Sequence, residues 1–309
     1  MKVLITGGGG MVGRNIAADP RSAAHDVLAP TRAELDLTDA VATRAYITRH
    51  RPDLIINTAG LVGGIQANMA AQAQFLGQNL AMGLSVLTGA ADVGVPHLIN
   101  LGSSCMYPKD LAGLLSEDRL LAAPLEPTNE GYAIAKIAIC KLTSALNAEQ
   151  PARTWRTLIP CNLYGDFDHY DPARSHVMAA ILAKTEQARR SGDAEVEIWG
   201  DGEARREFMY VGDLADFIWQ FHDRLSELPD VINVGAGHDA TINAYYRAVA
   251  DAVGYRGAFV HDLRRPVGMR RKLMDVSAQT RLGWRPPTPL TSGLIAAVAD
   301  YRRRYPHAL

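Results

Sequence analysis

The sequence contains little cysteine, no long apolar run and almost no net charge. Its 309 residues include three cysteines, Cys105, Cys140 and Cys161. Three are too few for a disulfide framework and fit a reducing cytoplasm. No run approaches the ~20 apolar residues that span a bilayer, so no membrane partner is expected. A formal net charge of −1 leaves no global positive field to hold a nucleic-acid backbone, and no metal site is predicted.

Alternating apolar runs and helical patterns fill the first half of the chain. Hydrophobic residues make up 48% of the sequence and charged residues 21%, a globular mixture. The opening MKVLITGGGG is too short in its apolar part for a signal-peptide core and is expected to be a strand. Strands alternating with helices predict βαβ units and a parallel sheet. The predicted strands are 2–6, 26–29, 54–57, 97–101 and 157–160, and the predicted helices are 11–18, 40–49, 72–93 and 132–147.

The rhythm changes after Gly165. Helical segments mix with short strands, and two stretches, 166–174 and 264–272, are expected to be loops. We predict an α/β fold: a doubly wound parallel sheet with a second, smaller lobe built from the C-terminal half. The helices expected in this half are 176–190, 211–221 and 242–253, and the strands are 196–199, 207–210 and 231–234.

A glycine loop joins the first predicted strand to the first predicted helix. Gly7, Gly10 and Gly13 form G-x-x-G-x-x-G, a spacing that resembles short-chain dehydrogenase/reductase (Rossmann) folds. Glycines allow a tight turn and let a pyrophosphate approach the helix N-terminus. We therefore predict a dinucleotide site that also includes Met11 and Val12. Residues 1–165, rejoined by about 211–240, would be the dinucleotide-binding domain, and 166–309 mainly the substrate-binding lobe.

The end of the second predicted strand favours NADP over NAD. An NAD enzyme usually places Asp or Glu there to bind the ribose, whereas residues 29–32 read APTR. Arg32 could pair with a 2′-phosphate, an interaction worth ~1.5–3 kcal/mol. The alternative is a solvated surface arginine. Asp36 and Leu37 lie just beyond and could flank the adenine.

A tyrosine and a lysine four residues apart share one face of a predicted helix. Tyr132 and Lys136 could form an acid–base pair, because a nearby ammonium favours the phenolate. Such a tyrosine exchanges a proton with a carbonyl or alcohol oxygen while a nicotinamide handles the hydride. The stretch LGSSC at 101–105 ends a predicted strand at the edge where ligands bind. If it stays extended, Ser103 and Cys105 point the same way, which favours Ser103 over Ser104 as the third member.

A second acid–base pair is possible on chemistry alone. A cysteine thiolate such as that of Cys105 can act as a base, and a histidine such as His176 can act as an acid near neutrality. The pair could move protons on carbons beside a ketone. Position alone favours packing, because a lone cysteine is usually a small core residue. Cys140 and Cys161 are assigned to packing.

Six motifs, taken together, connect these residues to a known family. They are LVGGI at 61–65, LGSSCMYP at 101–108, EPTNEGYAIAKIA at 126–138, NLYG at 162–165, SHV at 175–177 and REF at 206–208. The chain resembles, from Lys2 to about Ala296, the GDP-L-fucose synthase family of extended short-chain dehydrogenase/reductases. These enzymes are GDP-4-keto-6-deoxy-mannose 3,5-epimerase/4-reductases.

The resemblance implies a role for each matched residue. Tyr132 and Lys136 would be the reductase pair, with Ser103 on the substrate oxygen. Cys105 and His176 would be the epimerase base and acid. NADP(H) would be the cofactor and a GDP-sugar the substrate. The family also implies a homodimer packed through helices 72–93 and 132–147.

The same resemblance places a set of residues around the GDP portion of the substrate. Lysine and arginine can neutralise a pyrophosphate, and tryptophan offers a flat face for stacking. The matched positions are Asn162, Lys184, Trp199, Arg206 and Lys272.

Two departures from the family pattern concern the cofactor. Gly8 and Gly9 stand where the family often has His-Arg, which removes one basic contact to a 2′-phosphate. Leu61 stands where the family often has lysine. The NADP assignment therefore rests on Arg32.

Two further departures concern the reacting sugar. Gly131 replaces the usual proline before Tyr132, and segment 166–174 differs from the usual Asp-Asn-Phe loop. The sugar could therefore be a related deoxy or heptose derivative. The alternatives are a 4-keto reductase or 4-epimerase of another nucleotide sugar, such as a GDP-heptose derivative, without 3,5-epimerisation, and, more remotely, a non-catalytic NADP(H)-sensing protein.

Overall fold

A six-stranded parallel sheet forms the centre of the computed structural model, which describes residues 1–171, 175–265 and 269–306. The parts of the expected loops at 172–174 and 266–268 lie outside the described residues. The strand order is β2-β1-β3-β4-β5-β10. The chain leaves β1 toward β2 and returns to β3 on the other side, so the carboxyl ends of β1 and β3 form a topological switch point. The bounds are β1 Lys2–Thr6, β2 Asp26–Leu28, β3 Leu54–Asn57, β4 His97–Leu101, β5 Thr154–Pro160 and β10 Val231–Val234.

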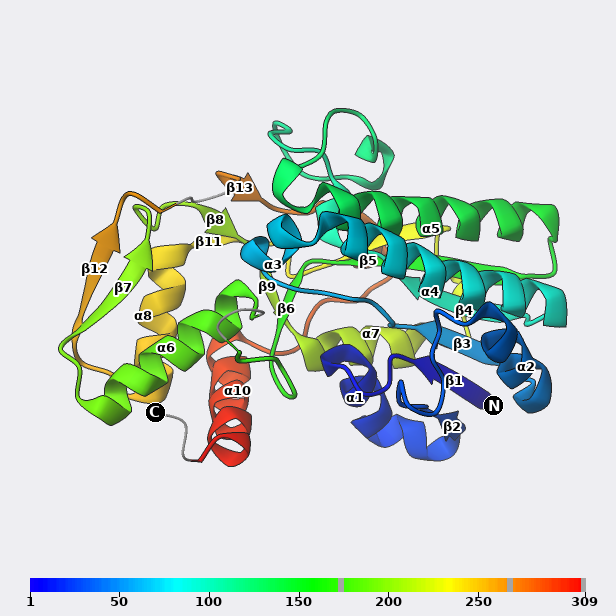
Figure 1. Ribbon diagram of the computed structural model, residues 1–309, viewed down its shortest axis with the longest axis horizontal. Helices are drawn as coiled ribbons and strands as arrows, with labels where there is room; N and C mark the ends of the chain where they lie inside the picture. Colours follow the sequence, from blue (N-terminus) through cyan, green and yellow to red (C-terminus); the bar gives the residue numbers. More distant parts are fainter. Residues whose placement is uncertain (172–174, 266–268, 307–309) are drawn as a thin grey trace.

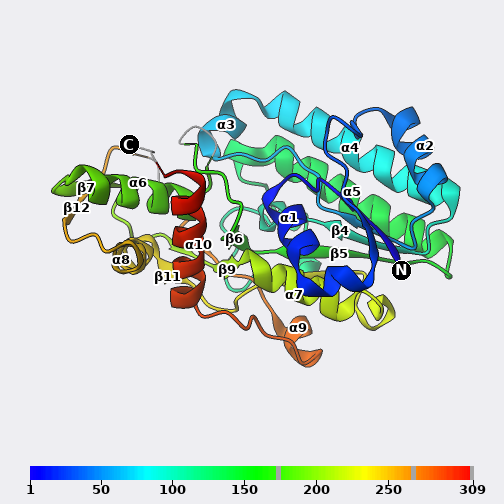
Figure 2. The same ribbon diagram turned by 90° about the horizontal axis from the view of Figure 1, so that it is seen from below.

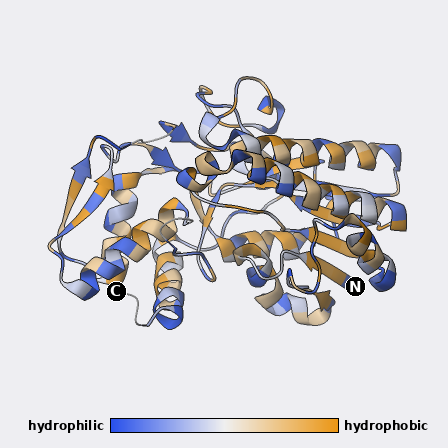
Figure 3. Ribbon diagram, in the orientation of Figure 1, coloured by the Kyte–Doolittle hydropathy of each residue, from blue (hydrophilic) through white to orange (hydrophobic). Residues whose placement is uncertain are grey.

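Helices cover both faces of this sheet (Figures 1 and 2). One face carries α2 (Ala40–His50), α4 (Gln72–Val93) and α5 (Glu130–Glu149), and the other carries α1 (Met11–Ala18) and α7 (Val211–Phe221). Burial on both faces explains why the central strands are almost wholly apolar, as Figure 3 shows. The predicted doubly wound α/β sheet is confirmed.

Local signals set the ends of these helices. The Asp39 side chain accepts a hydrogen bond from the Ala42 N–H and caps α2. Gly94, at φ 79°, ends α4 in the left-handed region that glycine tolerates.

Three helices and several short strands pack beside the sheet as a second unit with its own apolar core (Figure 1). Its helices are α6 (Val177–Ser191), α8 (Ile242–Val253) and α10 (Leu290–Arg304). The strands are β6 Asn162–Tyr164, β7 Glu195–Trp199, β8 Arg205–Arg206, β9 Phe208–Tyr210, β11 Ala240–Thr241, β12 Ala258–Asp262 and β13 Arg271–Lys272. The remaining helices are α3 Ile65–Ala70 and α9 Ser277–Arg281, and the 3-10 turns are Pro20–Ala24, Ser104–Met106, Glu117–Arg119, Pro127–Asn129 and Leu225–Glu227.

Several expectations need correction. The end of β4 does not stay extended, because Ser104–Met106 turn into a 3-10 helix capped by the Ser103 side chain. The expected loop 264–272 contains β13, which pairs in parallel with β8. Strand β12 and helices α3 and α9 were not predicted, since short or exposed elements lack a clear apolar period. Helix α10 was also missed, although Leu294, Ala297, Val298 and Tyr301 follow a helical period on its buried face. No helix in the described ranges is both long and apolar enough to cross a bilayer.

One buried carboxylate ties α6 to α10. Glu186 has no exposed side-chain surface and is paired with Arg189, Arg190 and Arg302. Burial opposes its ionisation, but the arginine hydrogen bonds prevail and lower the pKa of Glu186 from 4.5 to about 2. A depressed folded-state pKa stabilises the fold above the unfolded value, and the stabilisation is lost as pH falls.

We therefore expect Glu186→Gln to lower the free energy of unfolding by about 2–3 kcal/mol at neutral pH. The difference from wild type should narrow as pH falls below about 4.5 toward 2. Urea unfolding of wild type and variant at several pH values measures it. Glu149→Gln, at an exposed position, is the control. A pH-independent difference would contradict the electrostatic explanation.

Candidate active site

The glycine loop lies at the switch point, directly after β1. Gly7 has φ 69°, and a Cβ on Gly13 would lie 2.6 Å from the Gly7 carbonyl oxygen. The loop can therefore close tightly only with glycine at both positions. Gly10 caps α1 without a side-chain hydrogen bond, so the first N–H groups of the helix remain available to an anion.

A cavity of ≈ 250 Å³ opens above this loop. Its lining includes Gly7 and Gly10 together with Arg32, Asp36 and Leu37, all of them expected at the cofactor site. Arg32 is largely exposed and approaches the Asp36 carboxylate at 3.6 Å. Met11, Val12 and Gly13 lie at the start of α1 and are not part of the lining, and neither is Lys136, which was also expected at the cofactor.

The predicted serine, tyrosine and lysine meet beside the end of β4. Ser103 and Tyr132 are joined by a side-chain hydrogen bond. Lys136 lies on the same face of α5, with Nζ 5.9 Å from the centre of the Tyr132 ring, and donates to the Leu101 carbonyl oxygen at 3.0 Å. Ser104 is buried, and Ser103 is the serine that bonds Tyr132, so the structure favours Ser103.

Burial controls the protonation of this pair. It raises the pKa of Tyr132, with a further contribution from the charge of Cys105, against the Ser103 hydrogen bond. Burial also lowers the pKa of Lys136 to about 8. The expected phenolate is therefore not the favoured form, because desolvation outweighs the attraction of a lysine held by a backbone carbonyl. A neutral phenol is the form that donates a proton to a substrate oxygen.

Cys105 stands next to this group. Its Sγ accepts a hydrogen bond from Asn129 Nδ2 at 3.2 Å and lies 3.7 Å from Lys272 Nζ. His176 immediately precedes α6 and keeps exposed surface. Surrounding protein and the charges of His169 and Lys272 lower the pKa of His176. Lys272 thus neighbours both predicted epimerase residues.

The residues expected around GDP come from β6, α6, β7, β8 and β13. Arg206 and Lys272 are register partners on adjacent strands, and burial lowers the pKa of Arg206. Trp199 is 39% exposed and carries the Arg265 guanidinium 5.0 Å from its ring centre. Lys184 Nζ donates to the Glu197 carbonyl oxygen, and Asn162 Nδ2 to that of Glu207. Backbone carbonyls thus hold the Lys184 and Asn162 side chains in place.

Sequence reasoning missed Asn129, which precedes Tyr132 by three residues. The Asn129 Oδ1 is buried without a hydrogen-bond partner among the described residues, as is Ser175 Oγ beside His176. Buried polar atoms are normally satisfied, so both are candidates to contact a substrate. The sequence did offer one signal for Asn129: polar residues cluster at 126–130, just before the helix that carries Tyr132.

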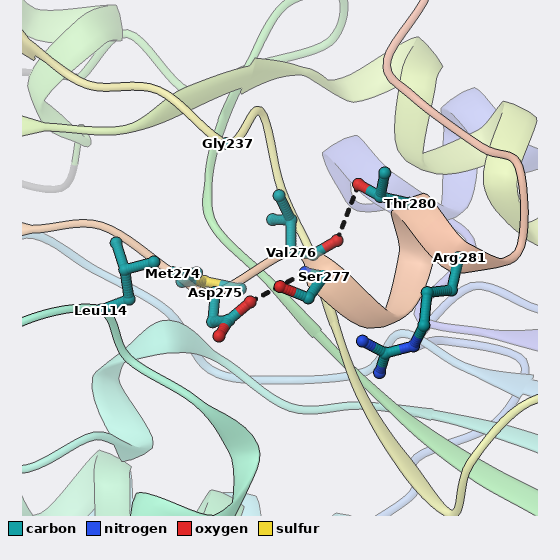
Figure 4. Close-up of a pocket in the computed structure, with 8 residues that line it drawn as sticks. All are labelled: Leu114, Gly237, Met274, Asp275, Val276, Ser277, Thr280 and Arg281. Atoms are coloured by element: carbon teal, nitrogen blue, oxygen red, sulfur yellow. Dashed lines mark hydrogen bonds between the residues drawn. The ribbon is translucent and has the colours of Figure 1, made fainter.

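A second cavity, ≈ 350 Å³, lies apart from these residues (Figure 4). Asp275, Ser277 and Arg281 surround it, and the Asp275 carboxylate caps the Ser277 N–H. None of the predicted site residues lines it. Within the described ranges, no cluster of His, Cys, Asp and Glu is arranged to hold a metal ion.

A glycine loop at a topological switch point, with a hydrogen-bonded Ser–Tyr pair and a lysine one turn along the helix, defines an oxidoreductase of the short-chain dehydrogenase/reductase class. Residues 3–235 match the NAD dependent epimerase/dehydratase family.

Characterised relatives cover almost the whole chain. A GDP-L-colitose synthase from Yersinia pseudotuberculosis is 48% identical, over 95% of this chain and 96% of its own. A GDP-L-fucose synthase from Azorhizobium caulinodans is 46% identical, over 97% and 96%. A GDP-D-glycero-L-gluco-heptose synthase from Campylobacter jejuni, solved in the presence of NADPH, is 28% identical, covers 97% and 98%, and superposes with a TM-score of 0.89. The chain belongs to the GDP-L-fucose synthase family of extended short-chain dehydrogenase/reductases.

Replacing Gly13 tests whether the glycine loop must close tightly in order to bind the cofactor. A Gly13→Val side chain would collide with the backbone of Gly7 and Gly8, so we expect NADPH binding to weaken at least about tenfold as the turn opens. Fluorescence titration with NADPH measures the change. Gly77→Ala is the matched control, because a Cβ there meets nothing within 4 Å and the residue does not line the cavity. Equal affinities for the two variants would contradict the packing argument.

Proposed function

We propose that the protein is an NADPH-dependent epimerase/reductase of a GDP-linked 4-keto-6-deoxy sugar, forming GDP-L-fucose or a close relative. The observation that carries this proposal is that Cys105 adjoins the Ser103–Tyr132–Lys136 set: its N–H donates to Ser103 Oγ at 3.2 Å, and it interacts with Tyr132. The family membership supports the same reaction. We further propose that residues 1–165 and about 211–240 bind the cofactor, while 166–309 mainly bind the GDP sugar.

Epimerisation comes first, because the carbons beside a ketone are acidic only while the ketone exists. The Cys105 thiolate removes a proton from carbon 3 or 5, and the electron pair moves into the enolate. His176 returns a proton to the same carbon from the opposite face. The lowered pKa of His176 makes its imidazolium a stronger donor. Each cycle inverts one carbon without net change in atoms or electrons.

Reduction then consumes the ketone. The glycine loop and Arg32 would hold the pyrophosphate and the 2′-phosphate of NADPH, and the nicotinamide of the bound cofactor would supply the hydride that carbon 4 needs. Tyr132, kept neutral by burial, donates its proton to the ketone oxygen, which Ser103 holds by a hydrogen bond. Lys136 lies one turn along α5, where its charge favours the phenolate that remains.

The GDP portion would lie across β8 and β13. Arg206 and Lys272 stand side by side there and can neutralise the diphosphate. Lys184 and Asn162 add a second charge and an amide, and Trp199 offers a stacking face.

A second candidate is the same chemistry on a different GDP-sugar. The relative with 48% identity is named a GDP-L-colitose synthase, and a structural neighbour is named a GDP-heptose synthase. Residues 166–171 precede His176 and place His169 near it. A side chain other than histidine at position 169 would therefore favour a different sugar.

Two further proposals concern the state of the protein. A homodimer would pack through α4 and α5, which expose the aliphatic side chains Leu84 and Ile134. The free thiols of all three cysteines fit a reducing cytoplasm.

The central test is turnover of GDP-4-keto-6-deoxy-mannose with NADPH in deuterated water. We expect cofactor oxidation and deuterium at carbons 3 and 5. Tyr132→Phe should slow reduction by roughly 10²–10⁴-fold and keep deuterium uptake, since a general acid is lost. Cys105→Ser should lose uptake, while Cys140→Ser, at a buried position outside the site, should behave as wild type. Mass spectrometry and NADPH absorbance are the readouts.

The outcomes separate the candidates. Reduction without deuterium would replace this proposal with a simple 4-reductase. No reaction with this sugar, but turnover of another GDP-sugar, would support the second candidate.

Replacing Arg32 tests whether this residue makes the protein prefer NADPH over NADH. Arg32→Ala should weaken NADPH binding by about 10- to 100-fold and leave NADH binding unchanged, because only NADPH carries the 2′-phosphate. Fluorescence titration of both cofactors measures the ratio. Arg49→Ala, exposed on α2, is the control. Equal losses for both cofactors would rule out recognition of the 2′-phosphate by Arg32.

A further inference from the structure

Asn129 and Lys272 approach one sulfur atom from two different parts of the fold. Asn129 ends the 3-10 turn before α5, and Lys272 lies on β13, more than 140 residues later. The Cys105 Sγ receives the Asn129 amide at 3.2 Å and has the Lys272 ammonium at 3.7 Å. Both groups present positive charge or a donor hydrogen to the sulfur.

We infer that Asn129 and Lys272 are positioning residues that hold Cys105 as the thiolate required of an epimerase base. The inference rests on the function proposed above and adds to it the two groups that select the reactive form of the cysteine. A thiolate accepts hydrogen bonds and is stabilised by a neighbouring cation, whereas a neutral thiol gains little from either.

The local hydrogen bonds favour this role over simple packing. The Asn129 side chain makes its one hydrogen bond in the described ranges to the cysteine sulfur, while its Oδ1 is buried without a partner. An asparagine kept for structure would satisfy both ends. The Cys105 N–H is bound separately by the Ser103 Oγ at 3.2 Å, which fixes the backbone and turns Sγ toward Asn129.

The position of Lys272 is also fixed from outside the site. Glu207, which is buried, accepts a hydrogen bond from the Met274 N–H at 3.0 Å and anchors the chain just beyond β13. Strand β13 pairs with β8 through Lys272 and Arg206. The ammonium is thus held near Cys105 by the fold, and its charge can serve the sulfur as well as a substrate phosphate.

Tyr132 on α5 is an ionisable group that also interacts with the cysteine. Negative charge on Cys105 raises the pKa of Tyr132. A thiolate therefore keeps the phenol protonated during epimerisation, ready to donate in the later reduction. The two half-reactions would share one electrostatic arrangement.

Alkylation of Cys105 by iodoacetamide tests the inference without substrate. Cys140 and Cys161 are buried, so peptide mass spectrometry reports the reactive cysteine. We expect the alkylation rate at pH 7 to fall about tenfold or more in Asn129→Ala and Lys272→Met. The pH profile should move upward in both. Asn129→Asp keeps the shape, adds negative charge, and should show the largest shift.

A matched control and a second readout complete the experiment. Thr128→Ala removes a hydroxyl that bonds only Glu126 in the described ranges and should leave the profile unchanged. In deuterated water, the Asn129 variants should lose deuterium uptake by a similar factor with unchanged NADPH affinity. If Asn129→Ala does not fold, Asn129→Asp and Lys272→Met carry the test.

The possible failures are distinguishable. Wild-type alkylation profiles in Asn129→Asp and Lys272→Met would overturn the inference and leave the proposed function intact. Deuterium uptake in Cys105→Ser equal to wild type would instead remove the epimerase function on which the inference rests.

Discussion

A row of buried hydrogen bonds crosses the central sheet near the carboxyl ends of its strands. The position of the glycine loop and of the residues after β4 depends on this row. Thr6 donates to Asn57, Asn57 to Asn100, and Asn100 to Thr157, across β1, β3, β4 and β5. Buried polar groups that are all paired fix register more sharply than apolar contacts do. The row lies at or near the carboxyl ends of these strands, so the glycine loop and Ser103 emerge in fixed relation.

At that edge of the sheet, the two reactive groups of the site, Tyr132 and Cys105, differ in their electrostatic surroundings. Burial keeps Tyr132 neutral and lowers the pKa of Lys136 to about 8. A few ångströms away, an amide and an ammonium surround the Cys105 sulfur. Burial thus favours the proton-donating form of Tyr132, while the Cys105 sulfur faces two donor groups. A reaction that removes a proton before delivering one requires that combination.

The second unit supplies charge to a site that the sheet positions. Glu207 binds the N–H groups of Gly237 and Met274, and so joins the end of β10 to the chain beyond β13. Through that junction, Lys272 reaches Cys105 just beyond the end of β4. The same arrangement orders the end of the basic stretch 264–272, because Arg271 and Lys272 pair with β8.

The sequence by itself determined the doubly wound sheet, the glycine loop and the helix bearing Tyr132 and Lys136. Each of these depends on local periodicity or on residues close together in the chain. Only the tertiary structure decided that Ser104 is buried, that Lys136 is bound by a carbonyl, and that Lys272 reaches Cys105. Such contacts join segments far apart in sequence, and desolvation depends on everything packed around a group, so neither leaves a periodic trace in the chain.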